Sequence, residues 1–218
     1  MLHYLQELFY ALDFSSLWDA VGRVIAIFLC LTVHETCHGL AAYALGDPTA
    51  KSQHRLSLNP LRHIDWIGLA LMFAAGFGWA KPVPVDPRYF RKPKQGMALT
   101  ALAGPVSNLV LALLALVLLR GAVAVLPGTA WAVWLVNFLL EISVLSVGLG
   151  LFNLIPIPPL DGSKVLAVFL PDRAYITLMR YERYGILVLL VLSLLNVGSI
   201  SISRMIYAVW SAMCSLIF

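Results

Sequence analysis

Two histidines and a glutamate near residue 35 are the residues with the clearest chemical potential. They belong to the run His34-Glu35-Thr36-Cys37-His38. Residues four apart lie on one face of an α-helix, so both imidazoles can bind the same Zn²⁺ ion. Glu35 would then lie beside the metal and could accept a proton from a water molecule whose pKa the metal lowers to about 7. The run therefore predicts a helical zinc site with hydrolytic chemistry.

The purely structural interpretation of this run is a pair of helix histidines that form hydrogen bonds with their neighbours, with Glu35 in a salt bridge. We favour the functional one, because ionisable groups inside an apolar segment are costly and usually serve a function. Cys30 and Cys37 are interpreted as small packing residues.

A third metal ligand should lie elsewhere, because catalytic zinc normally takes three protein ligands and keeps one position open. Asp161 stands out, since the prolines at 156, 158 and 159 end any helix before it. A carboxylate on such a break can point into a cavity, and an ordinary Asp-Gly turn is the alternative. The full set of candidates is His54, His63, Asp65, Asp86, Glu141 and Asp161.

Two asparagines are further candidates. Asn108 follows Gly104-Pro105 inside a stretch without charges, and Asn153 precedes the proline run. A hydrogen bond between helices would explain Asn108, and a helix-end cap would explain Asn153. Glu141 is expected to be structural or protonated rather than catalytic.

The elements that position these residues are predicted to lie in a membrane. Hydrophobic residues make up 61% of the 218-residue chain and charged residues only 12%, about half the usual charged fraction of a soluble domain. Apolar stretches of about 18 residues or more are typical of helices that cross hydrocarbon. The stretches without Asp, Glu, Lys or Arg are 97–119, 121–140, 142–160, 184–203 and 205–218.

We therefore predict a single all-α membrane domain, residues 1–218, with about five spans. Residues 1–19 are expected to form an interfacial helix. The expected spans are 21–45, 97–119, 131–152, 184–200 and 203–218.

Lys and Arg cluster in 46–63, 81–95 and 153–183, which favours the cytoplasmic side for all three. The apolar, glycine-rich residues 64–80 would then dip into the membrane and return, partly as strands. A short span over 64–80 remains the alternative.

The chain resembles the site-2 protease family, in its compact form without PDZ or CBS domains. Six motifs in the family's order, which together cover most of the chain, carry the resemblance: His34-Glu35-Thr36-Cys37-His38-Gly39, Leu45-Gly46-Asp47-Pro48-Thr49-Ala50, Leu58-Asn59-Pro60-Leu61-Arg62-His63-Ile64-Asp65, Gly76-Phe77-Gly78-Trp79-Ala80-Lys81-Pro82-Val83-Pro84-Val85, Gly104-Pro105-Val106-Ser107-Asn108 and Asn153-Leu154-Ile155-Pro156-Ile157-Pro158-Pro159-Leu160-Asp161-Gly162. The family often has proline where this chain has Trp66.

The resemblance implies that Asp161 is the third ligand of one Zn²⁺ per chain. It implies that Asn108 and Asn153 contact the substrate backbone or the developing oxyanion. It also implies a membrane-dipping sheet within residues 46–95 that presents the substrate as an added strand. Glu35 would be the general base of an intramembrane zinc endopeptidase.

The expected partners are the lipid bilayer and a substrate with a transmembrane helix. Nothing indicates nucleic acid, and the sequence does not reveal the oligomeric state. We expect the cell membrane of a bacterium or archaeon, with the active site nearer the cytoplasmic face. Two other functions stay open, a membrane metal transporter and an inactive relative that only holds substrates. A transporter would need polar groups in several spans along a path.

Overall fold

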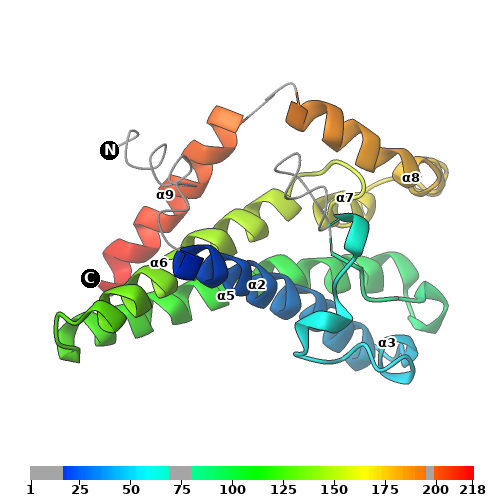
Figure 1. Cartoon of the computed structure of the whole chain (residues 1–218). Coiled ribbons are helices and arrows are strands. Elements are labelled where there is room, and N and C mark those ends of the chain that lie inside the picture. Colours follow the sequence, from blue (N-terminus) through cyan, green and yellow to red (C-terminus); the bar gives the residue numbers. More distant parts are fainter. Residues whose placement is uncertain (1–16, 69–79, 195–198) are drawn as a thin grey trace.

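Long helices dominate the computed structural model, which describes residues 17–68, 80–194 and 199–218 (Figure 1). The elements in chain order are α2 (Leu17–Ala44), α3 (Thr49–Ser52), η1 (Pro60–Arg62), η2 (Pro87–Tyr89), α5 (Pro93–Val125), α6 (Ala130–Asn153), α7 (Asp161–Ala167), α8 (Asp172–Leu194) and α9 (Ser199–Ile217). The described residues contain no strand. The predicted all-α class is therefore confirmed for this part of the chain.

Three described helices, α2, α5 and α6, are long and apolar enough to cross a membrane. They contain the spans predicted at 97–119 and 131–152 and nearly all of 21–45. Helix α8 begins twelve residues before the span predicted at 184–200, and α9 covers most of 203–218. Neither is among the described helices that qualify as spans, so the count of five remains a prediction.

Two expectations fall mainly outside the described residues. Residues 1–16 of the predicted interfacial helix 1–19 are not described, and Leu17 already belongs to α2. Residues 69–79 of the predicted re-entrant segment 64–80 are not described either. The described parts of 46–95 contain helices and turns and no strand, so the expected strands remain a prediction.

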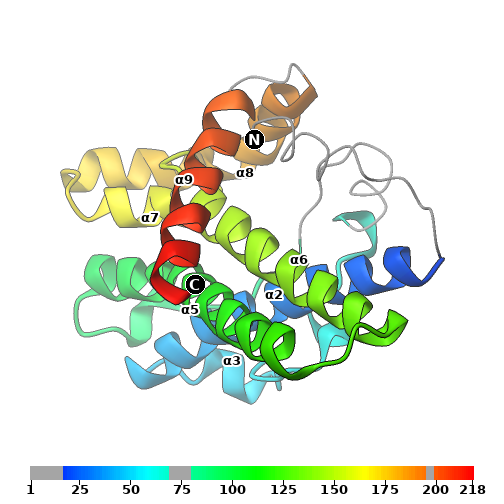
Figure 2. The same cartoon turned by 90° about the vertical axis from the view of Figure 1, so that its left-hand side faces the viewer.

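Helix α5 lies at the centre of the molecule, against α2, α6, α7 and α9. Figures 1 and 2 show α2, α5 and α6 side by side, with α9 crossing α5 and α6. Small residues permit this close packing, as Ala26 and Cys30 of α2 meet Ala115 of α5 and Ile142 of α6. Close approach of backbones through small side chains is the usual basis of helix association in membranes.

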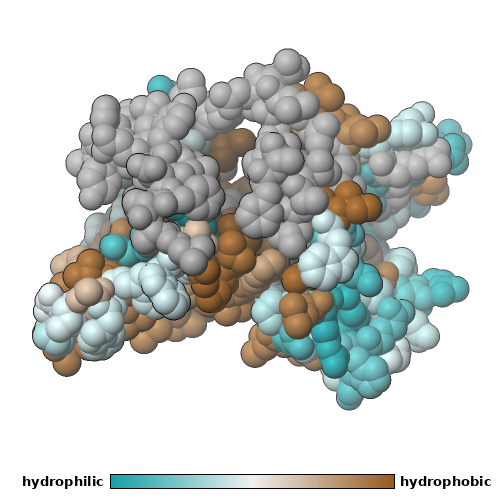
Figure 3. Space-filling model, viewed as in Figure 1, coloured by the Kyte–Doolittle hydropathy of each residue, from teal (hydrophilic) through white to brown (hydrophobic). Residues whose placement is uncertain are grey.

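The described residues on the face shown in Figure 3 are divided by polarity. Hydrophilic residues gather around α3 and its neighbouring loops, whereas hydrophobic residues cover much of the long helices. Many outward residues of α5 are apolar, among them Val106, Val110, Leu114, Val117 and Leu118. A water-soluble helix would place such residues against a core, so this face suits a lipid environment.

Candidate metal centre

Helix α2 brings His34 and His38 together one turn apart on its buried face. The two residues are almost fully buried, at 4% and 8% exposed. Their Nε2 atoms lie 3.0 Å apart, and the rings meet edge to face. The predicted sharing of one helix face is therefore realised in the structure.

Asp161 completes a compact triangle with the two histidines. Its Oδ2 lies 3.1 Å from Nε2 of each ring, although 127 residues separate it from His34. Burial alone would raise the pKa of the Asp161 carboxyl, but the hydrogen bonds with His34 and His38 lower that pKa below its usual range. The carboxyl group is therefore a charged carboxylate, which is the form that binds metals.

The turn between α6 and α7 delivers Asp161 to this position. Helix α6 ends at Asn153, the proline-containing residues 154–160 are not helical, and α7 begins at Asp161. The turn folds back tightly, since a Cβ atom on Gly162 would collide with the carbonyl of Leu154. The proline run thus interrupts the helix where the sequence predicted it.

His34, His38 and Asp161 form the only group of three His, Cys, Asp or Glu in the described residues that could hold a metal ion. Their donor atoms lie within 4.8 Å of one another. Two imidazole nitrogens and one carboxylate oxygen match the ligand set of catalytic zinc sites, which leave a fourth position open. The residues present therefore fit a Zn²⁺ ion.

The outer nitrogens of both rings are also held. Nδ1 of His38 donates a hydrogen bond to the carbonyl of Thr100 at 2.7 Å, because a carbonyl can only accept. Nδ1 of His34 lies 3.1 Å from Nδ2 of Asn108. Partners of this kind orient ligand histidines and select their tautomers.

Gly104 explains how α5 comes so close to the ligand pair. A Cβ atom at this position would collide with Nε2 of His38 and would lie 2.6 Å from Cε1 of His34. In the sequence, the Gly104-Pro105 pair only precedes Asn108 and begins one of the six family motifs. The role of Gly104, space for the two imidazoles, becomes visible only when α2 and α5 are packed together.

Glu35 points to a different partner from the two histidines. Its Oε2 accepts a hydrogen bond of 2.9 Å from the backbone N–H of Val83. This contact was not predicted, although the sequence contains a signal for it. Prolines at 82 and 84 have no N–H, so Val83 is the one donor among these three residues.

Val83 belongs to a short stretch, residues 81–86, here called the anchored segment. This segment is held at both ends. The N–H of Lys81 donates to the carbonyl of His63 at 2.9 Å. At the other end, the N–H of Asp86 donates to Oδ2 of the fully buried Asp47 at 2.7 Å. Asp47 also accepts from the N–H of Thr49 at 2.9 Å, which ties α3 to the same point.

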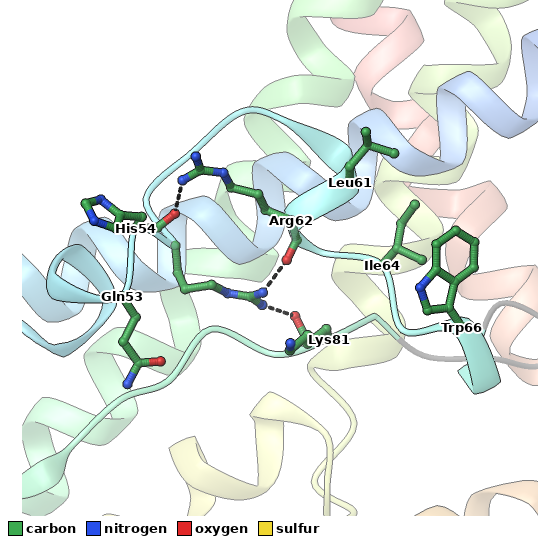
Figure 4. Close-up of a pocket in the computed structure, with 8 residues that line it drawn as sticks. Gln53, His54, Leu61, Arg62, Ile64, Trp66 and Lys81 are labelled. Carbon is green, nitrogen blue, oxygen red and sulfur yellow. Dashed lines mark hydrogen bonds between the residues drawn. The ribbon is translucent and has the colours of Figure 1, made fainter.

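Arg55 adds a third attachment of the anchored segment. It donates to the carbonyls of Lys81 and Pro82 at 2.8 and 3.1 Å and also to the carbonyl of Arg62. A pocket of about 420 Å³ with a cationic lining lies beside these contacts. Figure 4 shows Arg62, Trp66 and Lys81 in its wall. His34, His38 and Asp161 do not line this pocket. Two of its cations, Arg55 and Arg62, donate to backbone carbonyls and so hold the surrounding loops in place.

The other five candidate ligands do not reach the metal centre. His63 bonds to the carbonyl of Ser57, and Asp65 caps the backbone N–H groups of Ile67 and Gly68. Glu141 forms an ion pair with Arg23 at 2.5 Å, in agreement with the structural role expected for it. The full set is His54, His63, Asp65, Asp86 and Glu141.

The two asparagines occupy different surroundings. Asn108 is 0% exposed and lies behind His34. Asn153 is partly buried and donates to the carbonyl of Leu149 at 2.9 Å. The helix-end bond of Asn153 matches the structural interpretation, and its predicted contact with substrate stays a prediction.

Comparison with known proteins places these observations in a family. The sequence profile of peptidase family M50 matches residues 119–196. The chain is 42% identical over 178 residues to "Putative zinc metalloprotease YwhC" of Bacillus subtilis, and the alignment covers 81% of each chain. No solved structure matches the chain.

Two mycobacterial relatives are more distant. The identity to "Putative zinc metalloprotease Rip2" of Mycolicibacterium smegmatis is 29%, over 75% of this chain and 63% of the relative. For the protein of the same name from Mycobacterium tuberculosis (strain H37Rv), the identity is 30%, over 77% of this chain and 64% of the relative. The chain thus spans less than two thirds of either Rip2 protein.

The likeness to YwhC extends over most of both chains, and the ligand triangle fits the metal that these names specify. Zn²⁺ is accordingly the cofactor. The apolar helices that surround the triangle are long enough to cross a membrane. The chain belongs to peptidase family M50, the site-2 protease family, and is a zinc metalloprotease.

Proposed function

We propose that this metalloprotease is an intramembrane endopeptidase, which hydrolyses a peptide bond within or near a transmembrane helix of another membrane protein. The observation that carries this proposal is the position of the ligand triangle. His34 and His38 lie on the buried face of α2, and α5 packs directly on them through Gly104. A site enclosed by such apolar helices favours a substrate that reaches it from the bilayer.

In the proposed site, His34, His38 and Asp161 hold Zn²⁺. The metal supplies Lewis-acid chemistry, which polarises a peptide carbonyl and makes water a better nucleophile near neutral pH. Glu35 accepts the proton of the attacking water and passes it to the leaving amine. The Val83 N–H occupies Oε2 and so fixes the carboxylate, which leaves Oε1 for the proton.

The substrate must unwind before attack, because helical peptide carbonyls are engaged in hydrogen bonds within the helix. Asn153 at the end of α6 is proposed to contact the unwound backbone. Residues 46–95 remain the region where we expect the substrate to be held as an extended chain. The proposed location is the cell membrane, with the site nearer the cytoplasmic face.

A metal transporter is the other class of function with the same ligands. It would need further groups of ligands along a path through the spans. The residues that the structure describes contain one group of this kind, and it lies beside a carboxylate suited to proton transfer. The relatives' names also favour the protease.

The test is cleavage of a transmembrane peptide by the purified, reconstituted protein. We expect about one zinc per chain, a product that disappears after chelation, and recovery of cleavage when zinc is added back. Product masses would locate the cleaved bond relative to the apolar segment. Cleavage that survives complete removal of zinc, or zinc flux without any product, would contradict the proposal.

A further inference from the structure

Asn108 is the one polar side chain of α5 that faces a ligand histidine from behind. It is fully buried, and its amide lies 3.1 Å from Nδ1 of His34, on the opposite side of the ring from Asp161. Its Oδ1 has no hydrogen-bond partner among the described residues. A fully buried amide with one end on a metal-ligand ring calls for a chemical explanation.

The pair of Asn108 and His34 can be arranged in two ways. The amide nitrogen can donate to an unprotonated Nδ1, in which case the ring proton is on Nε2. Alternatively, a protonated Nδ1 donates to the amide oxygen after the side-chain amide flips, which exchanges its oxygen and nitrogen. Oxygen and nitrogen of an amide are interchangeable in position, so chemistry decides between the two.

Metal binding selects the second arrangement. A histidine that binds zinc through Nε2 must offer a lone pair there, so its proton lies on Nδ1. Nε2 of His34 is the atom that faces Nε2 of His38 and Oδ2 of Asp161. The amide oxygen, which has no partner otherwise, then accepts the proton of Nδ1.

His38 provides an internal comparison. Its Nδ1 bonds to the carbonyl of Thr100, a group that can only accept, so its Nε2 is kept available for a metal. Helix α5 supplies both acceptors. One is a backbone carbonyl before Gly104, and the other is the side chain of Asn108, one turn after it.

We infer that Asn108 is a positioning residue, which accepts the Nδ1 proton of His34 and so selects the ring tautomer and orientation that bind zinc. This inference rests on the proposed assignment of His34 as a ligand. It gives Asn108 a role different from the substrate contact that the family resemblance implies. A residue that is fully buried behind the ring is well placed for the ring and poorly placed for a peptide.

The experiment measures the zinc dissociation constant by competition with a chelator, in detergent-solubilised protein. Asn108→Leu removes the acceptor at similar size, and we expect zinc to bind roughly 10- to 100-fold more weakly. Asn108→Asp supplies a stronger acceptor and should bind zinc at least as tightly as the wild type. Asn137→Leu, at an exposed position of α6, is the matched control and should leave the affinity unchanged.

Thermal unfolding of each metal-free variant separates folding from metal binding, and Asn108→Ala provides a smaller replacement that adds no atoms to the buried site. Wild-type affinity in Asn108→Leu or Asn108→Ala, with only peptide cleavage reduced, would assign Asn108 to the substrate and overturn the inference. Equal weakening by Asp and Leu would overturn it as well. Full zinc affinity in His34→Ala would instead refute the ligand assignment itself, so the two failures are distinguishable.

Discussion

Glu35 and the histidines beside it have separate tasks in the proposed site. The histidines and Asp161 would bind the metal, whereas Glu35 is held by the N–H of Val83 and would handle the proton. Adjacent residues of one helix can divide these tasks because neighbouring side chains point about 100° apart. Substitutions should therefore separate metal binding from catalysis.

Glu35→Gln should leave zinc near one per chain and lower cleavage by about 10²–10⁴-fold, because the amide cannot accept the proton. The variant keeps an oxygen that can accept from Val83, so the fold should be unaffected. The measurements are metal content and product mass for reconstituted wild type and variant. Equal cleavage by the two proteins would show that Glu35 is not the base.

Asp161→Ala should lose zinc and cleavage together, because two histidines alone seldom hold the ion firmly. Glu141→Gln is the matched control, since it changes a carboxylate that pairs with Arg23 away from the triangle. It should retain zinc and most of the activity. Metal content after dialysis decides the outcome, and full zinc occupancy in Asp161→Ala would move the third ligand to another residue.

At the scale of elements, the close contact between α2 and α5 depends on one missing side chain. Gly104→Ala would place a methyl group on the ligand rings and should weaken zinc binding, although alanine favours a helix by about 0.5–1 kcal/mol. Gly121→Ala is the matched control in the same helix, where nothing lies within 4 Å of the added carbon. Unchanged zinc affinity in Gly104→Ala would mean that the helices can separate without cost to the site.

The anchored segment (residues 81–86) is the second element that the site depends on. Arg55→Lys would lose the forked contacts with the carbonyls of Lys81 and Pro82, which a single ammonium group cannot reproduce. We expect zinc to stay bound while cleavage falls by up to about 10²-fold, because Glu35 loses its alignment. Arg91→Lys, a substitution at an exposed position, is the control and should change neither zinc binding nor cleavage. Loss of zinc from the Arg55 variant would contradict the explanation that only the alignment of Glu35 is affected.

At the scale of the whole molecule, the orientation in the membrane is the main open prediction. Basic residues favour the cytoplasmic side for 46–63, 81–95 and 153–183. Single cysteines at Gln53 and Arg91, both exposed, should react with an impermeant thiol reagent from the same side. The background must lack the three native cysteines. Labelling from opposite sides would show that residues 64–80 span the membrane.

Much of the secondary structure of this protein could be predicted from local sequence patterns. Long apolar stretches predicted α2, α5 and α6, because backbone hydrogen bonds must be satisfied within each span. The spacing of His34 and His38 placed them on one face of α2, since a separation of four residues is a property of the helix itself. The proline run predicted the break between α6 and α7 for an equally local reason.

Long-range contacts were decided by the tertiary structure alone. From spacing, Asp161 was one candidate among six, and only the packing of α7 against α5, which also packs on α2, brings its carboxylate to the histidines. The same holds for Val83 on Glu35 and for Asn108 on His34, which join residues 48 and 74 positions apart. A local pattern specifies the direction of a side chain from its own element, but its partner depends on how distant elements pack.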